Sequence, residues 1–86
     1  MINLKQKQLI EDMLKKAKEK YADIELKNIS FSPDDSEHIF VNIRHSMDED
    51  ELLDFYDFAA ELDIETLMDY GYKITLMPTN DAFAFN

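Results

Sequence analysis

The stretch FSPDDSEHIFVNI, from Phe31 to Ile43, constrains the fold most because it predicts a β-hairpin. Pro33 cannot donate to a strand ladder, and the polar residues after it favour a turn. Apolar residues then occupy alternate positions, as in a strand with one buried face: Ile39, Val41 and Ile43. The opposite face carries a mixed set of side chains: His38, Phe40, Asn42 and Arg44. A hairpin with one apolar face needs a second layer to cover it.

The first strand of this hairpin does not keep a single alternation. Ile24 and Leu26 share one parity, whereas Ile29 and Phe31 share the other. Two arrangements explain the change of phase. Either the strand starts near Lys27, with Ile24 and Leu26 packed under a preceding helix, or a bulge at Lys27–Asn28 resets the phase. We favour the first arrangement.

Two helices flank the hairpin in the sequence. Residues 4–22 place apolar side chains at spacings of three and four, which predicts an amphipathic helix with its lysines facing out. Ser46 and Glu49 have the spacing of a capping box, so a second helix is predicted from Ser46 to about Tyr70. Gly71, the only glycine, fits a left-handed C-cap. We expect this helix to present one broad apolar face: Leu52, Phe55, Tyr56, Ala59, Ala60, Ile64, Leu67 and Met68.

A third strand is predicted over residues 72–77, where Tyr72, Ile74 and Leu76 share one face and Pro78 ends the strand. The fold class is therefore α+β: an αββαβ two-layer sandwich, with a three-stranded sheet and two helices packed on one face. The connection through the second helix is long enough for a parallel crossover. We expect one domain over residues 1–80, followed by an aromatic tail over residues 81–86.

The net charge of −10 is distributed unevenly along the chain. Residues 1–22 carry six lysines and three acids, whereas the rest carries three basic residues and sixteen acids. Such a surface repels phosphates, so the sequence disfavours nucleic-acid binding. The excess of acid either keeps a small protein soluble or forms a face that meets a basic partner.

Composition also narrows the class of protein. No cysteine is present, which excludes a disulfide framework, a cysteine-based zinc site and a thiol nucleophile. No apolar run approaches the roughly 18 residues of a membrane span, and the first sixteen residues lack the apolar stretch of a signal peptide. We therefore expect a cytoplasmic protein that binds neither membranes nor nucleic acid.

The element order resembles the minimal nucleotidyltransferase fold of small bacterial proteins. EHIFVNI is similar to the strand that carries Asp-x-Asp in that family, and ELLDFYDFAAELDIETLMDYGYKITLMPTN resembles the helix and strand that follow. The resemblance covers roughly Tyr21 to Asn80 and lies in hydrophobic pattern and element order. It implies a hairpin opened by Gly-Ser, with two aspartates and a third acid holding magnesium at the nucleotide phosphates.

The residues that carry that chemistry are missing. The resemblance places His38 and Phe40 where the two aspartates would stand, and a phenylalanine cannot ligate magnesium. Pro33 replaces a backbone donor that the phosphate cradle needs, and the third strand offers no acid. Kinship would imply a version that has lost its catalysis or rebuilt it; the alternative is a shared element order alone.

No other motif predicts a catalytic, metal or cofactor site. The acidic segment from Asp48 lacks the central glycine of a calcium loop, and it is explained as a helix start. His38 and His45 lie seven residues apart and are interpreted as surface histidines. Because neighbours along a strand point apart, Ser46 is not predicted to be a nucleophile beside His45.

We therefore predict a non-catalytic protein-interaction or regulatory module, such as an adaptor or an antitoxin-like subunit. The candidate partner-binding residues lie on the open sheet face, in the tail and on the acidic helix: Phe40, Met77, Phe83, Phe85, Asp54, Asp57 and Glu61. The partner is expected to be a protein, with a basic surface where it meets the helix. A homodimer formed through the sheet or the tail remains an alternative, as does a diverged nucleotidyltransferase without its metal-binding carboxylates.

Overall fold

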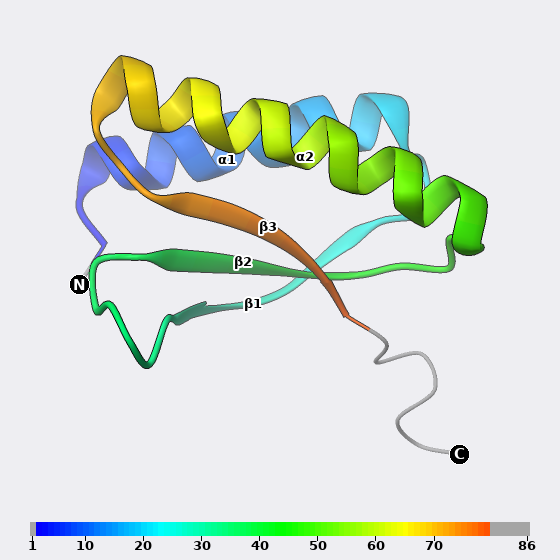
Figure 1. The fold of residues 1–86 in the computed structure, drawn as a ribbon, viewed down its shortest axis with the longest axis horizontal. Helices are drawn as coiled ribbons and strands as arrows, with labels where there is room; N and C mark the ends of the chain where they lie inside the picture. Colours follow the sequence, from blue (N-terminus) through cyan, green and yellow to red (C-terminus); the bar gives the residue numbers. More distant parts are fainter. Residues whose placement is uncertain (1, 80–86) are drawn as a thin grey trace.

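The computed structural model describes residues 2–79, which form two helices and a three-stranded sheet. The elements are α1 (Leu4–Lys20), β1 (Glu25–Phe31), β2 (Ile39–Arg44), α2 (Glu49–Tyr70) and β3 (Ile74–Thr79) (Figure 1). This order confirms the predicted αββαβ arrangement of the α+β class.

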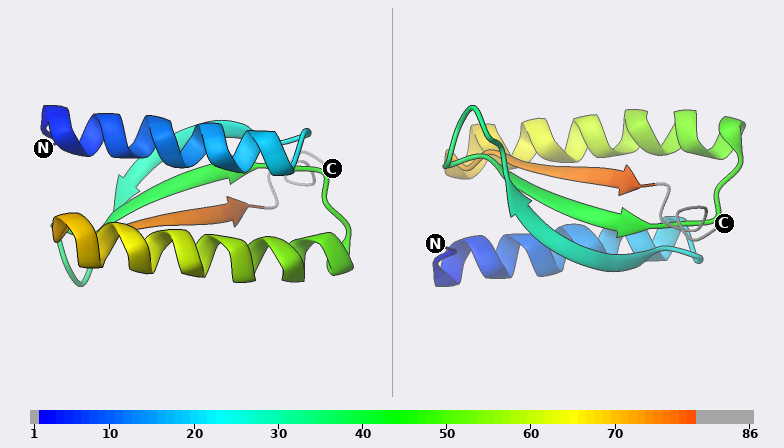
Figure 2. Two further views of the ribbon diagram at one scale, coloured as in Figure 1. Left: turned by 90° about the horizontal axis from the view of Figure 1, so that it is seen from above. Right: turned by 90° about the horizontal axis from the view of Figure 1, so that it is seen from below.

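The central strand of the sheet is β2, which pairs antiparallel with β1 and parallel with β3. Both helices lie side by side on one face, with α1 on the β1 side and α2 on the β3 side (Figure 2). Neither helix covers the other face of the sheet, and β3 is an edge strand.

The core lies between the sheet and the helices. The inward side chains of β2 and β3 are almost fully buried: Ile39, Val41, Ile43, Ile74 and Leu76. Met13 and Ala17 from α1 and Phe55 from α2 close the core from above. Burial of each large apolar side chain stabilises the fold by about 1.5–3 kcal/mol, so this layer holds the sandwich together.

The start of β1 differs from the favoured prediction. The strand begins at Glu25, and its register with β2 shifts between Leu26 and Asn28. The bulge alternative is therefore correct, and the start near Lys27 is wrong. Leu26 still pairs with Ile43, so the pairing of β1 with β2 continues on both sides of the bulge. Because β1 is an edge strand, Leu26 and Phe31 at its two ends stay about 40% exposed.

The helix boundaries also differ from the prediction. Asp48, and not Ser46, is the N-cap of α2, and its side chain accepts a hydrogen bond from the Glu51 N–H at 2.9 Å. The residues from His45 to Asp48 lie in no helix or strand, with His45 buried and Met47 half-buried against the core. At the other boundary, α1 ends at Lys20 because Tyr21 turns into the core in an extended conformation.

β3 continues through Pro78 to Thr79, although proline was predicted to end it. The Ile39 N–H donates to the Lys73 carbonyl, so alternate residues from Lys73 onward point their backbone groups at β2. The backbone groups of Leu76 and Pro78 therefore point to the free edge of the sheet. The missing N–H of Pro78 breaks no hydrogen bond with β2 there.

Gly71 confirms the predicted left-handed C-cap, with φ at 77° and its N–H bonded to the Leu67 carbonyl at 2.8 Å. A Cβ at this position would meet no heavy atom within 4 Å, so a side chain adds backbone strain and no clash. We expect Gly71→Ala to lower the free energy of unfolding by about 1 kcal/mol, measured by urea denaturation. Gly71→Asn is the control, because asparagine tolerates this conformation better; equal losses would contradict strain as the cause.

Candidate functional site

The hairpin loop uses its backbone donors within itself. The Ser32 N–H donates to His38 O, Asp35 N–H to Ser32 O, and His38 N–H to Asp35 O. The Asp34 N–H donates to the Ser32 hydroxyl, and the Glu37 N–H to the Asp35 carboxylate. A phosphate cradle needs several converging free N–H groups. Among residues 32–38, Pro33 has none and only the Ser36 N–H is left over, so this loop offers no cradle.

The strand positions that the resemblance assigns to magnesium ligands form a different contact. His38 Nε2 lies 2.7 Å from the Thr75 hydroxyl, and its ring packs edge-on against Phe40 with centroids 4.8 Å apart. Within residues 2–79 no group of three or more His, Asp or Glu side chains could hold a metal ion. His38 and Phe40 are therefore engaged with each other and with Thr75 on the open sheet face.

The other polar side chains of the open sheet face also pair with one another. Asn42 donates to Asn28 at 2.7 Å and to the Ser30 hydroxyl at 3.0 Å, and Arg44 lies 3.9 Å from Glu25. The predicted contact residues Phe40 and Met77 share this face, where Phe40 is half-buried and Met77 is 38% exposed. The exposed apolar area here is therefore small.

A hollow of about 450 Å³ lies beside the hairpin loop and reaches the connection from Gly71 to Lys73. Lys73 is the only basic residue that lines it, and its ammonium group lies 2.6 Å from the Asp35 carboxylate. This hydrogen bond holds the pKa of Asp35 below its ordinary value and raises that of Lys73. Because Lys73 is already paired with Asp35 and Glu37 adds a negative charge to the lining, the hollow disfavours a phosphate.

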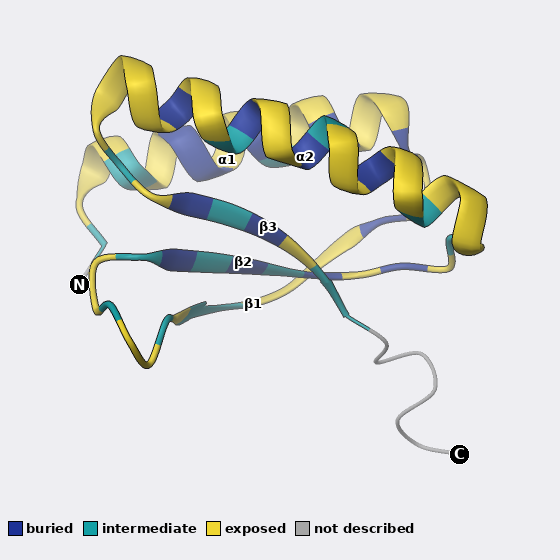
Figure 3. Cartoon of the chain, viewed as in Figure 1, coloured by how far each residue is buried: buried dark blue, intermediate teal, exposed yellow. Residues whose placement is uncertain are grey.

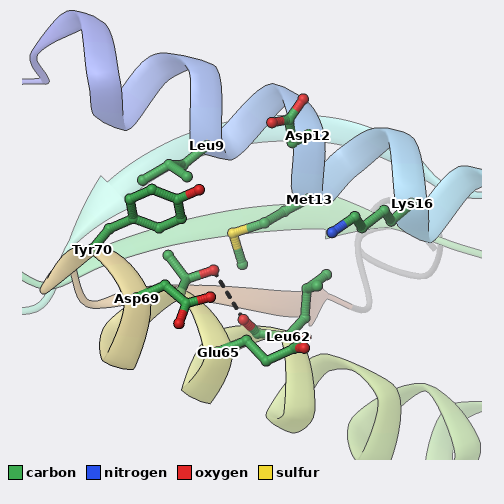
Figure 4. A pocket seen from close by; sticks show the side chains of 9 residues that line it. Leu9, Asp12, Met13, Lys16, Leu62, Glu65, Asp69 and Tyr70 are labelled. Atoms are coloured by element: carbon green, nitrogen blue, oxygen red, sulfur yellow. Dashed lines mark hydrogen bonds between the residues drawn. The ribbon is translucent and has the colours of Figure 1, made fainter.

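A second cleft lies between the helices, where Met13 of α1 faces Leu62 and Thr66 of α2 (Figure 4). Its volume is about 130 Å³, well below the range of about 300–1,000 Å³ that small-molecule sites occupy. The Thr66 hydroxyl donates to the Leu62 carbonyl at 2.9 Å, so it is already paired. This cleft is too small for a typical cofactor.

His45 is buried, which corrects the prediction that both histidines lie at the surface. Its Nδ1 accepts a hydrogen bond from the Met47 N–H at 3.1 Å, so the ring proton sits on Nε2. Nε2 is buried and has no partner among the described residues. His45 therefore fixes the connection between β2 and α2.

Most of the exposed large apolar side chains of the two helices lie on α2, much of which is exposed (Figure 3). The sequence predicted one broad face, but only the side facing the core is buried: Phe55, Ala59, Leu62 and Thr66. Large apolar side chains on the other side are 44–80% exposed: Leu53, Tyr56, Ile64, Leu67 and Met68. The prediction that Tyr56, Ile64, Leu67 and Met68 join the buried face is wrong, and α2 has a second apolar stripe.

The acidic residues predicted to meet a partner differ in their surroundings. Asp54 accepts a hydrogen bond from the Tyr21 hydroxyl at 2.5 Å and lies 3.7 Å from Lys20, so it joins α2 to the end of α1. Burial, followed by this hydrogen bond, raises the pKa of Tyr21 to about 12. Asp57 and Glu61 are exposed and have no hydrogen bond or ion pair within residues 2–79. They remain available to a partner, whereas Asp54 already serves the fold.

Asp63 is the acid that sequence reasoning missed. It lies on the β3 side of α2, where its carboxyl accepts a hydrogen bond from the Leu76 backbone N–H, but its Oδ1 is buried and has no partner within residues 2–79. Burial outweighs that hydrogen bond and raises the pKa of Asp63 to about 7. The Leu76 N–H lies on the free edge of β3, so the Asp63 side chain covers part of that edge.

Phe83 and Phe85 lie outside the described residues. Neither described helix is both long and apolar enough to cross a membrane. The chain matches no protein-family model, no curated protein and no solved structure.

Proposed function

We propose that this protein is a small cytoplasmic, non-catalytic interaction module that binds a basic segment of another protein along α2. The observation that carries the proposal is the coincidence of two features on one exposed helix face. An apolar stripe runs along the outward side of α2, and it is bordered by carboxylates that have no partner among residues 2–79, at Asp57 and Glu61.

The negative charge of α2 favours a positively charged partner. The helix carries nine acidic residues and no lysine or arginine. Close to such a helix, opposite charges speed association and like charges oppose it. A segment rich in lysine or arginine is therefore the favoured partner.

The apolar stripe supplies binding affinity that charge alone does not. Exposed ion pairs contribute little affinity, typically about 0–1 kcal/mol each. Burial of Leu53, Tyr56 and Ile64, which are 48–65% exposed, adds the hydrophobic contribution that makes a protein contact specific. The hairpin loop, which uses most of its backbone donors within itself, supports a non-catalytic role.

The proposal is tested by titrating ¹⁵N-labelled protein with an amphipathic leucine–lysine peptide and with its leucine–glutamate counterpart. We expect the basic peptide to shift amide signals between Leu53 and Leu67, and the acidic peptide to shift none. Raising the salt from 50 to 300 mM should weaken binding by about tenfold, because the flanking charges become screened.

Matched variants distinguish the effect of the charges on α2 from the effect of the total charge of the protein. The double variant Asp57→Asn, Glu61→Gln should bind the basic peptide several-fold more weakly. Glu11→Gln with Glu19→Gln changes the net charge equally on exposed α1 positions and should leave binding unchanged. Equal effects of both pairs, or no shift on α2, would refute the proposal. Shifts around Ser32 and His38 on adding nucleotide with Mg²⁺ would favour the nucleotidyltransferase alternative.

A further inference from the structure

We propose that the segment bound by α2 is itself an α-helix, which crosses α2 at Ala60 and carries lysine or arginine at its flanks. This inference rests on the proposed function and names the structural class of the partner. It follows from the spacing of the exposed stripe, the state of the β3 edge and the charges beside the stripe.

The exposed stripe has the geometry of a helix-packing surface. Four of its large side chains and the exposed Ala60 between them are spaced by three, four, four and three residues: Leu53, Tyr56, Ala60, Ile64 and Leu67. These spacings keep them on one side of the helix, opposite the buried Phe55 and Leu62. From Leu53 to Leu67 the stripe is about 21 Å long, at 1.5 Å per residue, which matches a helix of roughly four turns.

Ala60 lies at the centre of the stripe and is its only small side chain. Larger side chains stand one turn away on each side, at Tyr56 and Ile64, and a second turn away at Leu53 and Leu67. A second helix can approach most closely at a small residue and contact the larger ones on both sides. The centre of the stripe is therefore the crossing point.

An added strand fits this side of the molecule poorly. On the free edge of β3, Asp63 already receives the Leu76 N–H and Pro78 has no N–H to give. An incoming strand depends on such edge donors, whereas a helix pairs its own backbone groups. The exposed stripe is thus better covered by a helix.

A second copy of this chain also fits poorly, although the stripe is symmetric about Ala60. Two antiparallel α2 helices would bring Asp57 and Glu61 of each copy against the same residues of the other. With nine acids and no bases on each α2 helix, the repulsion opposes a homodimer. A helix with basic flanks places opposite charges at the same positions.

The structure also offers a place for one anchor side chain. A hollow of about 240 Å³ lies between α2 and β3, lined on the α2 side by Ile64 and Leu67 and on the β3 side by Ile74. It opens beside the stripe, and its exposed surface is mostly apolar, although polar residues also line it: His38, Asp63, Lys73 and Thr75. A leucine or phenylalanine of the partner helix fits this hollow, and buried apolar anchors of this kind dominate interface energies.

The test compares two peptides of one leucine–lysine composition, one patterned for a helix and one alternating as in a strand. Each is titrated into the full chain and into Ala60→Leu, with affinity measured by calorimetry. Because both residues are strong helix formers, Ala60→Leu should fold normally. We expect the helix-patterned peptide to bind about tenfold more tightly than the alternating peptide. Ala60→Leu should weaken the binding of the helix-patterned peptide about tenfold, because the larger side chain blocks close approach. Ala22→Leu, the same change at an exposed turn position, should have no effect.

The outcomes separate this inference from the proposed function. Equal binding of both peptides, or unchanged or tighter binding by Ala60→Leu, overturns the helix and leaves the docking function standing. Binding of neither peptide refutes the docking function itself. Light scattering on the protein alone should give the monomer mass. A dimer that Ala60→Leu dissociates would show that a second copy of the chain occupies the stripe, and it would overturn the proposal of a basic partner helix.

Discussion

Replacing Phe55 by alanine should lower the free energy of unfolding by about 4 kcal/mol. Phe55 is fully buried, and its ring packs edge-on against Tyr21 with centroids 5.0 Å apart. The substitution leaves a large cavity where α2 meets the core. A chain of this size has a total stability of roughly 4–13 kcal/mol, so the variant is expected to be partly unfolded at 37 °C. Urea denaturation followed by far-UV circular dichroism measures the loss.

Tyr56, the next residue along the helix, provides the matched control. Its side chain is 48% exposed on the outward stripe, and alanine is the stronger helix former. Tyr56→Ala should change stability by no more than about 0.5 kcal/mol. Equal losses at Phe55 and Tyr56 would mean that α2 buries one broad apolar face, and the second stripe would not exist.

This pair of residues also shows where the sequence stops being informative. The strict alternation of Ile39, Val41 and Ile43 fits only one strand orientation, so β2 and its inward face could be predicted. The apolar residues of α2 surround most of the helix, and adjacent positions such as Phe55 and Tyr56 look equivalent in sequence. Only the positions of β3 and α1 decide which of them is buried.

The candidate site divides in the same way. Asp57 and Glu61 could be placed on an exposed helix face, because charge and helical spacing are local properties. The pairing of Asp54 with Tyr21 joins residues 33 positions apart, and no local pattern indicates it. Asp63 looks like its neighbours in sequence, since its burial depends on β3, which follows later in the chain.

Asp63 gives the second large prediction, a loss of stability as the pH rises toward neutrality. The pKa of its carboxyl is raised from the ordinary 3.8 to about 7 in the folded chain, mainly by burial. The folded state therefore binds one more proton than the unfolded state between these values. Its contribution to stability is complete below pH 3.8 and is lost as the pH rises through 7.

The expected size of this loss is about 2 kcal/mol between pH 4 and pH 8. A shift from 3.8 to about 7 would correspond to roughly 4 kcal/mol, and partial exposure of the side chain screens about half of it. Asp63→Asn removes the titration and keeps an oxygen for the Leu76 N–H. We therefore expect the variant to become more stable than the native chain as the pH rises from 5 to 8, by urea denaturation at each pH.

The comparison with Asp63→Asn isolates this carboxyl from the other acids, which titrate in both proteins. Asp57→Asn, an exposed change on the same helix, should follow the pH dependence of the native chain. Because His38 and Lys73 line the same hollow as Asp63, the titrating group must be identified directly. The ¹³C signal of the Asp63 carboxyl should titrate near pH 7. A midpoint near pH 4 at Asp63 would mean that its carboxyl is solvated and that β3 keeps an open edge.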